Sequence, residues 1–290
     1  CTSRERRIVF NTFLSLDTSL LLGFDLVSFL ALAAIVLIGL PHGAFDGAVG
    51  LALGYGKNVK LMAAFILIYI GLAASVVVFW INFPNAALLL FLAISTWHFG
   101  IGDSQQGERF QSSVQALAHG GLVVIGISIL HTSEVDLIFA QLVNGETEFL
   151  WRFINVGAVA LTLILAAYLF LAWQKPKLRS RLAELIGLAV VYYILPPLAA
   201  FALYFCAVHS ARHLRYTWCR LRLLSYSPRL LIPLALFFTF ASWGAAILMF
   251  WLMPTTETIR GPILQIIFIG LAALTVPHML LVDGLFRRAH

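Results

Sequence analysis

Residues 26–53 read LVSFLALAAIVLIGLPHGAFDGAVGLAL. The stretch is apolar over more than the about 20 residues that an α-helix needs to cross a membrane. Within it lie Pro41, His42 and Asp46. Ionisable side chains are costly inside a bilayer and, where they occur, mark functional sites. This one stretch therefore predicts both a membrane-spanning fold and a buried polar site.

The composition of the whole chain supports a membrane fold. Of its 290 residues, 61% are hydrophobic and 11% charged, and the mean hydropathy is +0.94, whereas soluble domains are about 45–50% apolar and about 25% charged. The apolar runs are continuous rather than alternating, which argues against a β-barrel. The net charge of +6 comes from arginines beside the apolar runs, as in cytoplasmic loops of membrane proteins. We predict an all-α, polytopic transmembrane helix bundle in the lipid bilayer, one integral-membrane domain over 1–290, with no nucleic-acid partner.

The apolar runs predict about eight spans. Their ranges are 26–53, 61–83, 86–102, 114–130, 153–173, 182–218, 230–253 and 263–285, with an acidic connection around Glu134 to Glu148. If 182–218 crosses once, the basic loops at 175–181 and 212–229 lie on opposite sides, although basic loops tend to share the cytoplasmic side. We therefore expect kinked or re-entrant segments at Pro41 and at Pro196-Pro197. One long kinked helix over 182–218 is the alternative.

Five histidines lie inside or at the rim of these runs: His42, His98, His209, His213 and His278. Imidazole is a common metal ligand, so histidines that converge in a membrane predict a metal site. His209 and His213 are four residues apart, which places both rings on one face of a helix. The alternative for this pair is a helix end that leaves the bilayer.

Three of these histidines are followed by an aspartate about one turn later: Asp46, Asp103 and Asp283. A metal-ligating imidazole usually donates its other N–H to a carboxylate or carbonyl, which orients the ring. We predict these aspartates, with His278, as additional ligands or as partners of the ligands. For Asp103 and Asp283, ordinary charges at the ends of spans are the alternative.

The types of ligand in the sequence do not decide which metal binds. The three cysteines form no CxxC pair, and an all-imidazole site suits zinc, copper or iron. Trp97 and Phe99 flank His98, and Phe45 follows His42. These aromatic side chains are our candidates for lining an apolar substrate.

Three motifs occur together and in order: Pro41-His42-Gly43-Ala44-Phe45-Asp46, Trp97-His98-Phe99-Gly100 and His209-Ser210-Ala211-Arg212-His213. With them, the chain resembles the Brp/Blh family of bacterial and archaeal β-carotene 15,15′-dioxygenases over essentially its whole length. The resemblance implies a multi-pass protein of a bacterial or archaeal cell membrane that splits β-carotene with O2 into two retinals. It also implies a non-haem iron, Fe(2+), with His42, His98, His209 and His213 as metal-binding and catalytic residues, and delivery of retinal to a rhodopsin. The role of His278 and the oligomeric state stay open.

Other classes fit parts of the pattern. A membrane metal or proton transporter also places histidine and aspartate in broken spans, and a membrane iron oxygenase could act on another lipid or carotenoid. A di-iron desaturase is disfavoured because it needs repeated histidine boxes and the chain has one HxxxH, at His209 and His213. A retinal-binding photoreceptor is disfavoured because all four lysines lie in predicted loops, where none offers an amine for a Schiff base.

Overall fold

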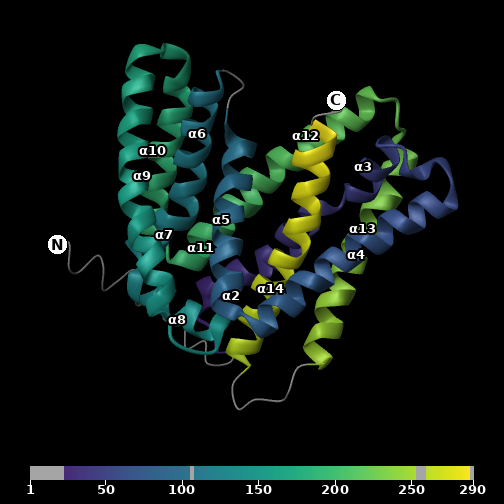
Figure 1. Ribbon diagram of the computed structural model, residues 1–290, viewed down its shortest axis with the longest axis horizontal. Coiled ribbons are helices and arrows are strands. Elements are labelled where there is room, and N and C mark those ends of the chain that lie inside the picture. Colours follow the sequence, from purple (N-terminus) through teal and green to yellow (C-terminus); the bar gives the residue numbers. More distant parts are fainter. Residues whose placement is uncertain (1–22, 105–107, 253–258, 288–290) are drawn as a thin grey trace.

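The computed structural model describes residues 23–104, 108–252 and 259–287, and every regular element in these ranges is helical (Figure 1). The α-helices are α2 (Leu26–Ala34), α3 (Asp46–Ala52), α4 (Val59–Asn82), α5 (Pro84–Asp103), α6 (Arg109–Gly121), α7 (Ile127–Leu130), α8 (Thr132–Val143), α9 (Glu148–Gln174), α10 (Arg179–Ile194), α11 (Pro197–Ala202), α12 (Ala211–Leu223), α13 (Pro228–Leu252) and α14 (Arg260–Met279). The predicted all-α class is confirmed.

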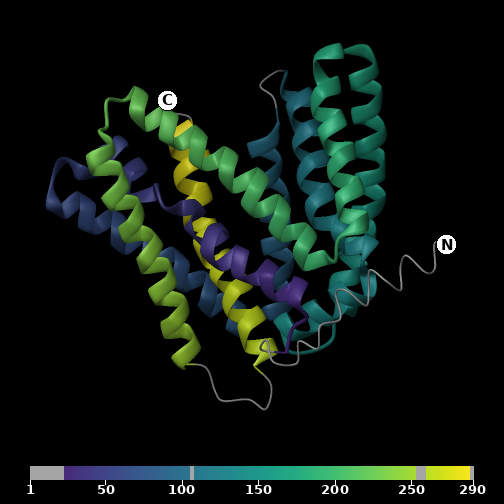
Figure 2. The same cartoon turned by 180° about the vertical axis from the view of Figure 1, so that it is seen from behind.

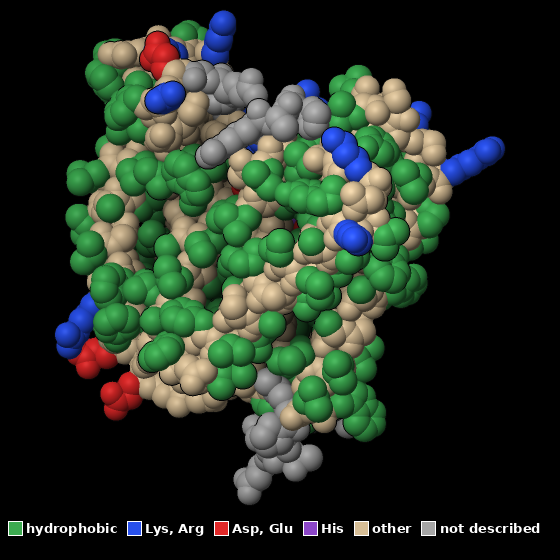
Figure 3. Space-filling model, turned by 45° about the vertical axis from the view of Figure 1, so that its right-hand side comes forward, with side chains coloured by type: hydrophobic (Ala, Val, Ile, Leu, Met, Phe, Trp, Pro, Cys, Tyr) green, Lys and Arg blue, Asp and Glu red, His purple; other side chains and the backbone are tan. Residues whose placement is uncertain are grey.

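Seven helical stretches of the described residues are long and apolar enough to cross a membrane. They are Leu26–Ala52, Val59–Asn82, Pro84–Asp103, Arg109–Leu130, Glu148–Gln174, Pro228–Leu252 and Arg260–Phe286. Figure 3 shows a broad band of hydrophobic side chains with Lys and Arg gathered mainly above it. The chain is a multi-pass membrane protein, with seven candidate spans where the sequence predicted about eight.

The difference in number arises at 182–218, where the structure contains a turn. α10 ends at Ile194 and α11 begins at Pro197, because a proline lacks the N–H that would continue the helix and disfavours a helical residue before it. From this point the chain turns back, so the two limbs form a V (Figure 2). The basic connection after α9 and the end of α12 consequently lie on the same side of the molecule (Figure 1). The alternative of one long kinked helix is wrong.

The acidic connection contains a helix that the sequence analysis missed. α8 buries Val135, Ile138, Phe139 and Leu142, a spacing that gives one apolar face. The carboxylate of Asp136, also on α8, accepts hydrogen bonds from the Thr147 hydroxyl and the Trp151 indole. The acidic residues suggested a loop, although Glu134 and Asp136 lie on the polar side of this helix and Glu148 begins α9.

The backbone is irregular where the sequence places its polar residues. The predicted break at Pro41 is present, since α2 passes into a π-helix (Ile35–Gly39) and a 3-10 helix (Leu40–Gly43) before α3. Three further π-helices follow, at Leu122–Gly126, Leu203–Ser210 and Leu280–Phe286, and the last two contain His209 and Asp283. π-Helical segments are rare and occur frequently at functional sites.

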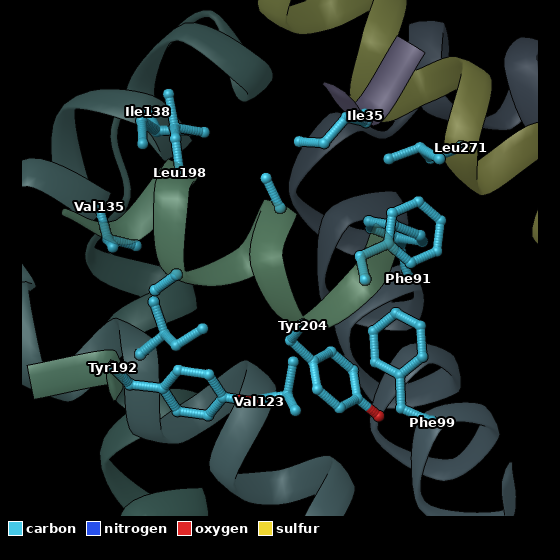
Figure 4. Close-up of a cluster of buried hydrophobic side chains, with 14 of the residues drawn as sticks. Ile35, Phe91, Phe99, Val123, Val135, Ile138, Tyr192, Leu198, Tyr204 and Leu271 are labelled. Atoms are coloured by element: carbon cyan, nitrogen blue, oxygen red, sulfur yellow. The ribbon is translucent and has the colours of Figure 1, made fainter. Parts of the chain in front are cut away.

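The helices pack in two groups. α9 and α10 stand side by side with α6 at one edge of the molecule, whereas α4, α12 and α13 lie toward the other, with α14 between them (Figures 1 and 2). A hydrophobic cluster joins the groups. In it, the rings of Phe99 from α5 and Tyr204 from the π-helix Leu203–Ser210 meet edge to face, with 5.5 Å between their centres (Figure 4).

α5 and α6 approach so closely that they leave no room for a side chain between them. A Cβ atom on Gly100 would lie 1.9 Å from the carbonyl oxygen of Ala116, and one on Gly120 would lie 1.7 Å from that of Thr96. Both obstacles are backbone atoms, which cannot rotate away. This contact fixes α5, the helix that carries His98, against its neighbour.

We expect Gly120→Ala to lower the free energy of unfolding by about 1–3 kcal/mol, the usual cost of overpacking, because α5 and α6 would have to separate. Thermal unfolding in detergent micelles measures the change. Gly71→Ala on α4 is the control, because a Cβ there meets nothing within 4 Å, and it should leave stability unchanged or raise it by up to about 1 kcal/mol. Equal stabilities of the two variants would contradict the close packing.

Candidate metal centre

All five predicted histidines converge in one buried cluster. His42 comes from the 3-10 helix Leu40–Gly43, His98 from α5, His209 from the π-helix Leu203–Ser210, His213 from α12 and His278 from α14. None of the five is more than 6% exposed. The cluster therefore joins four parts of the sequence that are far apart, because only His209 and His213 are close to each other in the chain.

The closest set is His42, His98 and His278, whose candidate ligand atoms all lie within 4.8 Å of one another. The His98 and His209 rings lie 5.0 Å apart, and the His213 and His278 rings 4.7 Å apart, centre to centre. His278 is thus central to the group, next to His42, His98 and His213. The sequence had left its role open.

Three of the rings donate one N–H to an oxygen atom. The Nδ1 atom of His42 lies 2.7 Å from the carbonyl oxygen of Gly39, that of His98 lies 2.7 Å from Asp283, and that of His278 lies 2.8 Å from Asp46. Carbonyl and ionised carboxylate oxygens only accept hydrogen bonds, so each Nδ1 carries the proton. The Nε2 lone pair of each ring is then available for a metal.

The buried nitrogen atoms fit a metal ion. Nε2 of His98, His209 and His278 is buried and has no hydrogen-bond partner among the residues that the structure describes. Buried polar atoms are almost always satisfied, so three such atoms in one cluster need a common explanation. A cation bound by the imidazoles would satisfy them, and the oxygen partners of the Nδ1 atoms are those that metal-bound histidines usually have. His213 differs, because its Nε2 lies 3.3 Å from the Thr217 hydroxyl.

The carboxylates pair with histidines of other helices, not with the histidine that precedes them. Asp46 follows His42 but bonds His278, and Asp283 follows His278 but bonds His98. Both carboxylates therefore lie next to imidazoles, although the same-span pairing is not found. Each bond ties two separate histidine-bearing segments together.

Asp103 lies elsewhere, since its carboxylate bonds no histidine. It accepts hydrogen bonds from the Tyr204 hydroxyl and the Arg212 guanidinium, both at 2.7 Å, and Arg212 also pairs with Glu184 at 2.6 Å. Arg212 stands between His209 and His213 in the sequence. Asp103 consequently ties α5 to the segment that carries both of these histidines.

An apolar cavity of about 500 Å³ reaches the cluster at His42 and His278. Its walls come from α4, α13 and α14 and include Tyr69, Phe238 and Gly270. α4 and α13 have few buried residues. The cavity therefore lies between helices that face the bilayer.

A second, polar cavity of about 990 Å³ reaches His209 and His213. Its lining includes five arginines: Arg109, Arg181, Arg212, Arg220 and Arg287. The cluster thus separates an apolar cavity from a basic one.

The three aromatic candidates are not in the lining of the apolar cavity. Trp97 is 44% exposed and lines the polar cavity, whereas Phe45 packs on Trp218 at 5.8 Å between ring centres. Phe99 contacts the His209 ring at 4.7 Å and lines a small apolar pocket with Phe201. Tyr69, which the sequence analysis missed, does line the apolar cavity. Its sequence context, an apolar run, contains no signal for this.

A buried histidine cluster that could hold a metal ion lies between helices that can cross a membrane, and comparison with known proteins gives the family. The sequence model of β-carotene 15,15′-dioxygenase matches residues 33–286. The chain is 35% identical over 267 residues to the β-carotene 15,15′-dioxygenase of uncultured marine bacterium 66A03, covering 92% of this chain and 96% of the relative. It is 27% identical over 287 residues to the probable β-carotene 15,15′-dioxygenase Blh of Halobacterium salinarum, covering 88% and 83%. No solved structure matches. The chain belongs to the β-carotene 15,15′-dioxygenase family.

We expect Arg212→Met to destabilise the fold because Asp103, only 1% exposed, would lose its cationic partner. Breaking a buried ion pair costs about 3–5 kcal/mol. Since Arg212 is 36% exposed, solvent screening lowers our expectation to about 2 kcal/mol. Chemical unfolding in micelles measures it. The double variant with Asp103→Asn should recover much of the loss, and a single variant as stable as the parent would contradict the role of this ion pair.

Proposed function

We propose that the five-histidine cluster holds iron(II) and that the chain uses it, with O2, to cleave β-carotene at its 15,15′ double bond into two retinals. The observation that carries this proposal is the set of three buried, unpartnered Nε2 atoms beside an apolar cavity. Family membership supports the reaction, and the buried nitrogen atoms and the apolar cavity support binding of the metal and of the polyene.

The chemistry of the donors supports iron. An all-nitrogen site accepts several first-row metals, but a dioxygenase reaction requires one that activates O2. Iron(II) bound here would supply that activation. We propose His42, His98, His209 and His213 as ligands, and the central position of His278 supports adding it to the set. The Gly39 carbonyl, Asp283 and Asp46 would then hold the rings of His42, His98 and His278 in orientation.

The apolar cavity would bind the polyene. A carotenoid dissolves in the hydrocarbon region of the bilayer, and α4 and α13 border both that region and the cavity. Entry between these helices would bring the substrate to His42 and His278 without passage through water. The apolar walls would exclude water from the reaction, and α14 would position the central double bond beside the histidines. Retinal could leave by the same route into the lipid, where an acceptor such as a rhodopsin could bind it.

The reaction balances without a further reductant. One β-carotene and one O2 give two retinals, so both oxygen atoms enter the two new aldehyde groups. No proton has to be taken up or released overall. This agrees with an apolar cavity that contains few polar side chains.

We expect cells that accumulate β-carotene to lose it on expressing the chain and to form about two retinals per carotene, because both halves of a centrally cleaved molecule carry an aldehyde. Chromatography of both compounds tests this. His42→Ala and His98→Ala should retain little iron, measured by elemental analysis, and form no retinal. Unchanged carotene in aerated, iron-replete cells would contradict the proposal, and metal flux without retinal would point to a transporter.

The cavity can be tested apart from the metal. We expect Gly270→Phe to reduce kcat/KM for β-carotene at least about 10-fold, because its ring would fill space needed by the polyene, while iron content stays unchanged. Gly187→Phe on α10 is the matched control. Both glycines have nothing within 4 Å of an added Cβ, but Gly187 lies outside the cavity lining. Equal activity of the two variants would contradict this route.

A further inference from the structure

Tyr69 connects the apolar cavity to the histidine cluster. It lies on α4 and contributes to the cavity wall, and its hydroxyl donates a hydrogen bond to Oδ2 of Asp46 at 2.7 Å. The same carboxylate accepts from Nδ1 of His278. Asp46 is 1% exposed and His278 is fully buried. This hydrogen-bonded chain joins α4, α3 and α14.

The hydroxyl distinguishes between two otherwise similar oxygen atoms. Nδ1 of His278 lies 2.8 Å from Oδ1 of Asp46 and 3.0 Å from Oδ2, so the imidazole alone does not fix the rotation of the carboxylate. The Tyr69 hydroxyl binds Oδ2 and thereby leaves Oδ1 as the nearer acceptor for His278. A buried carboxylate also needs donors, because burial of an unpaired charge is costly. Tyr69 and His278 together supply them.

The space around this carboxylate is restricted. A Cβ atom on Gly43 would lie 3.1 Å from Oδ2 of Asp46 and 3.5 Å from Nδ1 of His278. The turn that follows His42 therefore packs directly against the pair. A small rotation of Asp46 would shift either the His278 ring or this turn.

We propose that Tyr69 is a positioning residue for the metal centre. Its hydroxyl, acting through Asp46, orients the His278 imidazole toward the site, while its ring forms part of the substrate wall. The inference rests on the proposed function, because it requires a metal bound by the cluster. It extends the set of functional residues to a tyrosine that has no place in the histidine motifs.

The two roles of Tyr69 can be separated by removing only the hydroxyl. Tyr69→Phe keeps the ring and hence the cavity wall. If the hydroxyl acts through Asp46 and His278, metal affinity and kcat change while KM for β-carotene does not. If the side chain acts only as a substrate contact, the metal is unaffected.

The experiment uses the full chain, purified in detergent, stripped of metal and titrated with Co(II) against a competing chelator. For Tyr69→Phe we expect metal binding weaker by about 10-fold, within the range seen for partners of metal ligands, together with a shifted visible spectrum of the bound Co(II). With iron restored, kcat should fall and KM should stay within about 2-fold. Unchanged Co(II) affinity and spectrum would overturn the proposal, as would an altered KM alone.

Tyr55→Phe is the matched control. The Tyr55 ring stacks on Phe65 at 5.2 Å between centres, and Phe65 contacts Tyr69, so the control removes a hydroxyl from the same aromatic group. Its Co(II) affinity and activity should equal those of the parent chain. An equal loss in both variants would mean a general effect on packing and would overturn the proposal.

A double variant tests the path through Asp46. In an Asp46→Asn background, Tyr69→Phe should cause little further loss of metal affinity, because residues that act through one another are not additive. A full additive loss would overturn the proposal. Failure of the proposed function is distinguishable, since it would leave the parent chain itself without bound metal or retinal formation.

Discussion

The structure depends on how five buried imidazoles are accommodated between apolar helices. Each neutral ring carries one N–H and one lone pair, and both must be satisfied away from water. Asp283 and Asp46 accept the N–H groups of His98 and His278. Both bonds join different histidine-bearing segments, so the polar groups that orient the rings also hold the bundle together. The remaining lone pairs converge, and this is the property that a metal site requires.

The irregular backbone around the cluster follows from the same constraint. Non-helical backbone at membrane depth is tolerated only where protein encloses it or a cavity accepts its polar groups. The turn at Pro41 has one such group, the Gly39 carbonyl, and the His42 ring satisfies it. The break therefore provides the acceptor for the histidine that it positions. At Pro196 the break has a different effect, because it returns the chain toward the basic side and places His209 and His213 near α5.

The sequence predicted the all-α fold, the break at Pro41 and the five histidines that meet, because hydropathy and polar residues within apolar runs are local signals. It did not predict which carboxylate meets which imidazole. Asp46 and Asp283 were predicted as additional ligands or as partners of the ligands, and the imidazole that each one bonds depends on how α3, α5 and α14 pack. The role of Asp103 was missed for the same reason. Tyr69 was missed because it lies in an apolar run that only indicates a span. α8 was missed because its acidic residues suggested a loop.

The two cavities reach different histidines and differ in polarity. The apolar one reaches His42 and His278, and the arginine-lined one reaches His209 and His213. A polyene in the arginine-lined cavity would displace water from guanidinium N–H groups that make no bond within the chain, which is unfavourable. The apolar cavity has few polar side chains, among them Tyr69, Ser242 and the two histidines. The hydroxyls of Tyr69 and Ser242 already donate hydrogen bonds within the chain, so a polyene would not deprive them of a partner. Under the proposed function, the substrate therefore approaches His42 and His278 from the lipid side, whereas the cavity at His209 and His213 suits polar molecules. His42 and His278, the two histidines that line the apolar cavity, both have rings held by an oxygen acceptor, Gly39 and Asp46. Under the proposed function, imidazoles of fixed orientation therefore lie where the position of the double bond decides the products.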